Sequence, residues 1–236
     1  MGGGIARRGR RVPAFGIGPL IAASLGIILL GLLRTPLRWS GAAMVLLAAV
    51  WAARVPQPDI LISADGRNVG VRGQDGRLHL MHAAKGTRDA FLLREWLAAD
   101  ADPRMATDAS LTAGVSCDDH GCVMEAAGGA FIAQALKAEA LADDCERAAL
   151  IVTTRPAPAG CAASVIDAGR LRRQGAMALR RSREGFVVEA VKPGGIDRPW
   201  SPAADEGGAD ATVLARPATP RAIDATPSEA DLQAEE

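Results

Sequence analysis

Residues 14–33 form a run of twenty positions without a charged side chain, and most of these positions are apolar. A helix of that length spans the roughly 30 Å hydrocarbon core of a bilayer. Residues 39–55 form a second, shorter apolar run that contains two tryptophans, a residue type enriched at membrane interfaces. The two runs predict two transmembrane helices within residues 14–58. Gly26 and Gly31 are expected to let another helix approach closely.

Charge is segregated along the chain, although its 27 basic and 27 acidic side chains cancel. Residues 1–58 contain seven arginines and no acid, whereas residues 200–236 contain two arginines and eight acids. The basic arm at residues 1–13 is expected to lie beside a membrane as a topology anchor. The acidic tail, which is rich in Pro and Ala, is predicted to be disordered. A cleaved secretory signal is the alternative for the first apolar run, although a second apolar run disfavours it.

Residues 59–81 predict a meander of three short strands. The strands are expected at residues 60–62, 69–71 and 78–81, where apolar side chains are continuous or alternate with other residues. Asp65-Gly66 and Asp75-Gly76 mark the two turns, because glycine accepts a positive φ at no steric cost. A meander of this size needs a further layer packed on its apolar face.

The remainder of residues 59–199 alternates between helical and strand patterns, which predicts a single mixed α/β domain. Helices are expected at residues 87–99, with Thr87 as the cap, and at 137–145 and 167–174. Strands are expected at residues 130–136, 148–154, 176–180 and 186–191.

This order of elements resembles the carboxyl-terminal part of ComEC-type competence proteins. In that family, membrane helices precede a metallo-β-lactamase-like domain that opens with strands separated by Asp-Gly turns. Residues 65–71, 75–78 and 150–155 carry the resemblance, which covers roughly residues 14–200. It implies a role in DNA uptake at the bacterial inner membrane. The implied partners are the lipid bilayer, further helices of a channel and single-stranded DNA.

The membrane face that carries the domain is left open by the sequence. The basic arm and two spans favour the cytoplasm, whereas the resemblance implies the opposite side of the inner membrane.

The metal-binding motif of the family, of His-x-Asp-x-Asp-His type, has no counterpart here. Residues 83–90 occupy the corresponding region, and Lys85 and Arg88 there repel a divalent cation. The chain has three histidines, His79, His82 and His120, which are too few for a two-metal hydrolase. We therefore predict a degenerate, noncatalytic domain without a cofactor.

Two other functions stay open. One is a metal-dependent hydrolase with atypical ligands, drawn from Cys117, His120, Cys122 and Cys145. The other is a membrane-anchored interaction domain unrelated to competence, with the acidic tail as its contact surface.

The four cysteines are Cys117, Cys122, Cys145 and Cys161. Two disulfides fit this number if the domain lies outside the cytoplasm. Of the three possible pairings we favour the pairing of sequence neighbours, Cys117 with Cys122 and Cys145 with Cys161. Four small, buried, unpaired thiols are the alternative.

A basic cluster is the remaining candidate for a binding site. It consists of six arginines within residues 170–183, namely Arg170, Arg172, Arg173, Arg180, Arg181 and Arg183. Such a cluster can contact the phosphates of DNA. Only Phe186 lies near it in the sequence, so base stacking has little support. A solvated face paired with nearby acids is the alternative interpretation.

Overall fold

The computed structural model describes residues 16–82, 89–192 and 213–215. The chain divides into two units, one of residues 1–58 with 86–111 and one of residues 59–85 with 112–236. The grouping of residues 86–111 with the first unit differs from the expectation of one domain over 59–199. The basic arm at residues 1–13 and most of the acidic tail lie outside the described residues.

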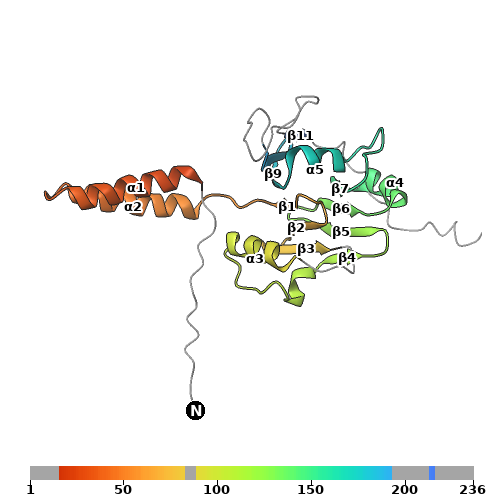
Figure 1. Ribbon diagram of the computed structural model, residues 1–236, viewed down its shortest axis with the longest axis horizontal. Helices are drawn as coiled ribbons and strands as arrows, with labels where there is room; N and C mark the ends of the chain where they lie inside the picture. The colour runs from red at the N-terminus through yellow and green to blue at the C-terminus, as the bar shows by residue number, and fades with distance from the viewer. Residues whose placement is uncertain (1–15, 83–88, 193–212, 216–236) are drawn as a thin grey trace, which may run out of the picture. The chain divides into compact units, whose positions relative to one another are not determined.

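The first unit contains a hairpin of two helices, α1 (Ile17–Leu32) and α2 (Arg38–Ala53), which Figure 1 draws side by side. The helices touch through glycine, as expected for Gly26. A Cβ atom on Gly26 would lie 2.8 Å from the carbonyl oxygen of Gly41. A Cβ atom on Gly31 would meet nothing within 4 Å, so Gly31 takes no part in the contact between α1 and α2.

Both helices are shorter than the apolar runs that encode them. Each has 16 residues, which corresponds to a length of about 24 Å. Leu33 is already extended, and Arg54 follows the last residue of α2. Within the described part of the chain, no helix has both the length and the apolar character needed to cross a membrane. The predicted transmembrane pair within residues 14–58 is therefore not supported.

Besides the hairpin, the first unit contains helix α3 (Ala90–Ala99) and most of the short 3-10 helix η1 (Ala109–Thr112). Asp89 caps α3, because its side chain accepts hydrogen bonds from the backbone N–H groups of Phe91 and Leu92. The predicted cap, Thr87, lies outside the described residues. Leu93 and Leu97, one helical turn apart, are the buried side chains of α3.

A six-stranded antiparallel sheet forms one half of the second unit. Its strands run in the order β11-β10-β9-β1-β2-β3. Their bounds are β1 Ile60–Ile62, β2 Asn68–Arg72, β3 Leu78–His82, β9 Met177–Ser182, β10 Gly185–Ala190 and β11 Val213–Ala215. The meander β1-β2-β3 is the one predicted. Gly66 and Gly76 in its two turns have φ values of 69° and 73°, a conformation that favours glycine.

A five-stranded mixed sheet forms the other half, in the order β4-β5-β6-β7-β8. Its strands are β4 Val115–Cys117, β5 Gly121–Glu125, β6 Phe131–Ala135, β7 Leu150–Thr153 and β8 Ser164–Ile166. The strands β4, β5 and β6 pair antiparallel, whereas β6, β7 and β8 pair parallel. Helix α4 (Ala138–Arg147) makes the crossover from β6 to β7.

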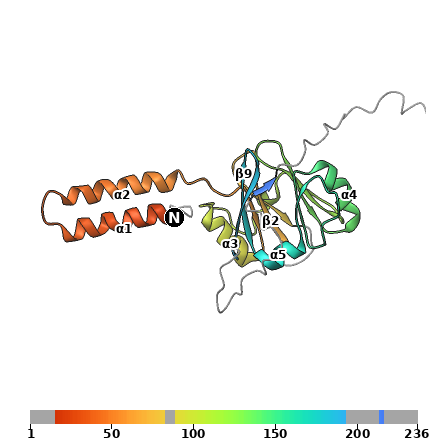
Figure 2. The same cartoon turned by 90° about the horizontal axis from the view of Figure 1, so that it is seen from above.

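The two sheets share one apolar core, to which Ile60, Val71 and Leu179 contribute from one sheet and Ile132 and Val152 from the other. Helix α5 (Ala168–Gln174) adds Leu171 to this core. A second, smaller core joins α4 to its neighbours in the five-stranded sheet. Figures 1 and 2 show this arrangement of strands and helices. The mixed α/β class that the sequence predicts is confirmed.

Three stretches of the chain differ from the prediction. Residues 115–125, where no strand was expected, form the hairpin β4-β5. Strand β8 was not predicted. Residues 213–215 lie in the tail that was expected to be disordered, yet they form β11 because the edge of β10 provides hydrogen-bonding partners.

Candidate functional site: an acidic pocket beside a disulfide

The hairpin β4-β5 is closed by a disulfide and a carboxylate. Cys117 lies directly opposite Cys122 in the strand pairing, and the two are disulfide-bonded. Between them, the Asp118 carboxylate accepts hydrogen bonds from the backbone N–H groups of His120 and Gly121, at 2.7 and 2.8 Å. These two hydrogen bonds lower the pKa of Asp118. The turn is therefore held in one conformation, with a fixed negative charge.

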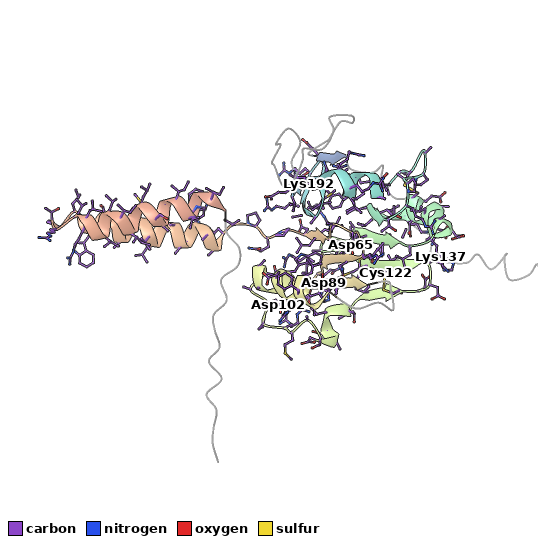
Figure 3. The ribbon with its side chains drawn as sticks, viewed as in Figure 1. Asp65, Asp89, Asp102, Cys122, Lys137 and Lys192 are labelled. Carbon is purple, nitrogen blue, oxygen red and sulfur yellow. A yellow bond between two sulfur atoms is a disulfide. The ribbon has the colours of Figure 1, made fainter. Side chains whose placement is uncertain are left out.

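A pocket of about 420 Å³ lies between this hairpin and α4. The hairpin contributes Asp118, His120 and Cys122. Figure 3 labels Cys122 on the five-stranded sheet. The helix contributes Glu139, Asp143 and Asp144. Glu139 and Asp143 are four residues apart and so lie on one face of the helix. The sequence alone does not reveal this site, because the helical spacing of the acids does not show which hairpin they face.

Asp144 has the least favourable environment for a charged group in the pocket. Burial raises its pKa above the ordinary value, and the negative charges of Asp143 and Asp118 raise it further. The pocket is therefore a region of negative potential, which repels phosphate groups and attracts cations. Among the described residues, however, no three His, Cys, Asp or Glu side chains are arranged to hold a metal ion.

A second disulfide fixes the helical wall of the pocket. It joins Cys145 of α4 to Cys161, 16 residues further along the chain. Cys145 is buried in the smaller core between α4 and the five-stranded sheet. The bond ties α4 to the segment that leads into β8. The pairing of both disulfides is the neighbour pairing that the sequence analysis favoured.

The alternative metal site of Cys117, His120, Cys122 and Cys145 is not formed. A metal ion binds the thiolate of cysteine, and all three of these sulfur atoms are in disulfides. Of the four side chains, only His120 is therefore outside a disulfide.

The three histidines have separate environments. His79 of β3 is buried, and its Nε2 lies 3.0 Å from the carboxylate of Asp75 in the β2-β3 turn. Burial alone would raise the pKa of Asp75, but hydrogen bonds from His79 and from the N–H of Arg77 lower it. The contact fixes this turn. His82 ends β3, and its side chain lies outside the described part. His120 lines the acidic pocket.

The six arginines do not form one surface. Arg180 and Arg181 are consecutive on β9, so they point to opposite faces of the sheet. Arg180 lies 3.5 Å from Glu189 of β10. The guanidinium of Arg181 lies over Gly128, in the turn between β5 and β6. Arg170 donates a hydrogen bond to Gln174 within α5. Arg172, Arg173 and Arg183 are exposed, so at most part of the cluster is accessible to DNA.

No family model, curated protein or solved structure matches this chain. Its function therefore has to be inferred from its own residues and their geometry.

Proposed function

We propose that this chain is a membrane-attached, noncatalytic part of a ComEC-type DNA-uptake apparatus. One observation carries the proposal: the hairpin α1-α2 exposes large apolar side chains on both helices. Ile17, Leu32, Leu46 and Leu47 are 74%, 76%, 68% and 70% exposed. Exposed apolar area costs roughly 25 cal/mol per Å² in water. A hairpin of this kind therefore requires a lipid environment or further apolar helices around it.

The charges beside the hairpin fit a membrane surface. Arg34 and Arg38 lie at the turn between the helices, and Arg54 follows α2. The guanidinium of Arg38 lies 5.5 Å from the centre of the Trp39 ring, a pair of side chains suited to the interface between headgroups and acyl chains. No acidic residue occurs before Asp59. Anionic lipids attract such a segment, which favours attachment to the bacterial inner membrane.

The second unit is assigned no catalysis in this proposal. Its meander with two Asp-Gly turns supports the resemblance to a metallo-β-lactamase-like domain, while residues 83–90 lack the metal ligands of that family. The two disulfides favour the oxidising side of the membrane for this unit. In the complete apparatus, further membrane helices supply the path for single-stranded DNA.

Fractionation of cells tests membrane attachment. The full chain is expected in the membrane fraction, and to remain there after a carbonate wash. Leu46→Glu combined with Leu47→Glu places two charges on the exposed face of α2 and is expected to release the chain. Phe91→Glu is the matched control, because Phe91 is 66% exposed but belongs to α3. A double variant that stays in the membrane while the chain is folded would contradict the proposal.

A transformation assay tests the role in DNA uptake. Deletion of the gene is expected to lower the frequency of transformation, and the wild-type gene, but not the Leu46→Glu, Leu47→Glu variant, is expected to restore it. An unchanged frequency would instead favour a membrane-anchored interaction domain unrelated to competence. Metal analysis and a nuclease assay with Mn²⁺ or Zn²⁺ test the catalytic alternative. Nuclease activity that His120→Ala abolishes would overturn the noncatalytic assignment.

A further inference from the structure

The acidic pocket between the β4-β5 hairpin and α4 has the size of a ligand site without the geometry of a metal site. Its volume of about 420 Å³ lies within the range of pockets that bind small ligands. Of the described residues that line it, Asp118, Glu139, Asp143 and Asp144 are acidic, and none is lysine or arginine. Its acids do not converge as a metal-binding group within the described part of the chain. The pocket therefore favours a cation whose charge is spread over several hydrogen-bond donors.

The three acids of α4 have no basic partner among the residues that the structure describes. Neither Glu139, Asp143 nor Asp144 forms an ion pair there. Burial and the charges of Asp143 and Asp118 raise the pKa of Asp144, and the positive charge of Arg147 offsets only part of this effect. A cation in the pocket would stabilise the charged form of these carboxylates.

The floor of the pocket belongs to the five-stranded sheet, beside the strip that α4 covers. Helix α4 packs against Ala133 and Ala135 of β6 in the smaller core. Val123 of β5 lines the pocket and lies opposite Ala133, so its side chain points to the same face of the sheet. Phe131, two residues before Ala133, points there too. Val123 and Phe131 are 37% and 44% exposed, which places apolar surface next to the carboxylates.

An arginine side chain matches both parts of this surface. Its planar guanidinium has five N–H donors, which several carboxylates can share. Its aliphatic stem packs on apolar surface while the charged head stays with the acids. Arginine is also enriched at protein interfaces. A protein segment can fill the pocket and cover Val123 and Phe131 at the same time, which a free small cation cannot do.

We propose that the acidic pocket is a docking site for an arginine side chain of a partner protein, whose neighbouring apolar side chains cover Val123 and Phe131. Charge complementarity selects this occupant. The proposal does not rest on membrane attachment or on DNA uptake, so each can fail without the others.

Binding of a fluorescent peptide to the full chain in mild detergent tests this proposal. The probe is a short peptide in which leucine and arginine alternate. The matched probe carries citrulline at the arginine positions, because citrulline has nearly the shape of arginine without its charge. A hydrogen bond between charged groups is worth a factor of ten or more in affinity. The citrulline peptide is therefore expected to bind at least about tenfold more weakly than the arginine peptide.

Removal of charge from the pocket gives the reciprocal measurement. Glu139→Gln with Asp143→Asn removes two exposed carboxylates of the helical wall. This double variant is expected to bind the arginine peptide at least about tenfold more weakly, and the citrulline peptide as the wild type does. Glu146→Gln with Glu184→Gln removes the same amount of charge from exposed positions that do not line the pocket. This control is expected to behave like the wild type.

The comparison of the two peptides on the wild-type chain requires no variant, and circular dichroism checks that both double variants are folded. Equal binding of the two peptides to the wild type, or binding of neither, would overturn the proposal. So would an equal loss of affinity in the two folded double variants, because the attraction would then come from overall charge. Spermidine or Ca²⁺ that binds more tightly than the arginine peptide would identify a free polyamine or a metal ion as the occupant and would also overturn it.

Discussion

Gly26 of α1 and Gly41 of α2 approach each other backbone to backbone. A Cβ atom on Gly41 would lie 2.5 Å from the carbonyl oxygen of Gly26, and one on Gly26 would lie 2.8 Å from that of Gly41. Real Cβ atoms do not come so close to a backbone atom, so any side chain at either position forces the helices apart. Small residues at this crossing therefore set the distance between the two helices.

Replacing Gly41 with alanine is expected to destabilise the hairpin by roughly 1–3 kcal/mol, a typical cost of overpacking. Gly31→Ala is the matched control. It lies on the same hairpin in open space, so alanine there should stabilise the helix by roughly 0.5–1 kcal/mol. Thermal unfolding in detergent, followed by the helical circular dichroism signal, measures both effects. Equal effects at the two positions would contradict the close contact.

The two disulfides should contribute unequally to stability. The chain-entropy estimate grows with the length of the closed loop. Replacing the pair Cys145 and Cys161, which are 16 residues apart, with serine is expected to lower the free energy of unfolding by about 3 kcal/mol. The same replacement of Cys117 and Cys122, which are five residues apart, is expected to lower it by about 2 kcal/mol. Urea unfolding of the two double variants gives the comparison. Thiol titration of the unreduced, denatured wild type should detect no free thiol, and four free thiols would refute both bonds.

Asp144 should make the free energy of unfolding depend on pH. The direction of this dependence is opposite to that expected for an acid in a salt bridge. Its folded pKa is raised by burial and by the charges of Asp143 and Asp118, so the folded chain binds this proton more tightly than the unfolded chain. The contribution to stability is present at low pH and is lost as the pH rises from about 3.8 through the folded pKa.

Replacing Asp144 with asparagine removes this loss. The variant is therefore expected to be more stable than the wild type at pH 7, and the difference should shrink towards pH 4. Urea midpoints across this range measure it. Glu146→Gln, on the exposed side of α4, is the control and should show no such trend. A variant less stable than the wild type at pH 7 would show that the charge of Asp144 is needed.

The accessible arginines should add little affinity for DNA. Arg172→Ala with Arg173→Ala removes two exposed charges from the last turn of α5. Non-specific binding to phosphates has a Kd of roughly 10⁻⁴–10⁻⁶ M at physiological salt. The full chain is expected to bind a single-stranded oligonucleotide no more tightly than this. The Kd of the double variant should differ from that of the unchanged chain by less than about threefold.

Fluorescence anisotropy at several salt concentrations measures this binding. The control is the double variant Arg67→Ala with Arg77→Ala, which removes the same amount of charge from the exposed turns of the meander. If affinity for the oligonucleotide fell only in the Arg172, Arg173 variant, and this affinity depended less on salt concentration, α5 would be established as a DNA contact.

Local patterns predicted most of the elements, because they depend on residues close together in the chain. The alternation at residues 69–71 and the Asp-Gly turns led to β2 and to both turns of the meander. The strands β4 and β5 that flank the Asp118-to-Gly121 turn were not expected, since their hairpin needs β6 as a neighbour. The ends of α1 and α2 were also misjudged, because apolar residues continue beyond the last helical turn.

The chain's sequence by itself determined the periodicity of its strands and helices, the apolar character of its hairpin and the absence of histidine from residues 83–90. Only the tertiary structure decided that α4 brings Glu139, Asp143 and Asp144 opposite Asp118, and that β11 covers half of β10. The physical reason is that periodicity is a property of neighbouring residues. A pocket or a sheet edge depends instead on the register and packing of segments far apart in the chain.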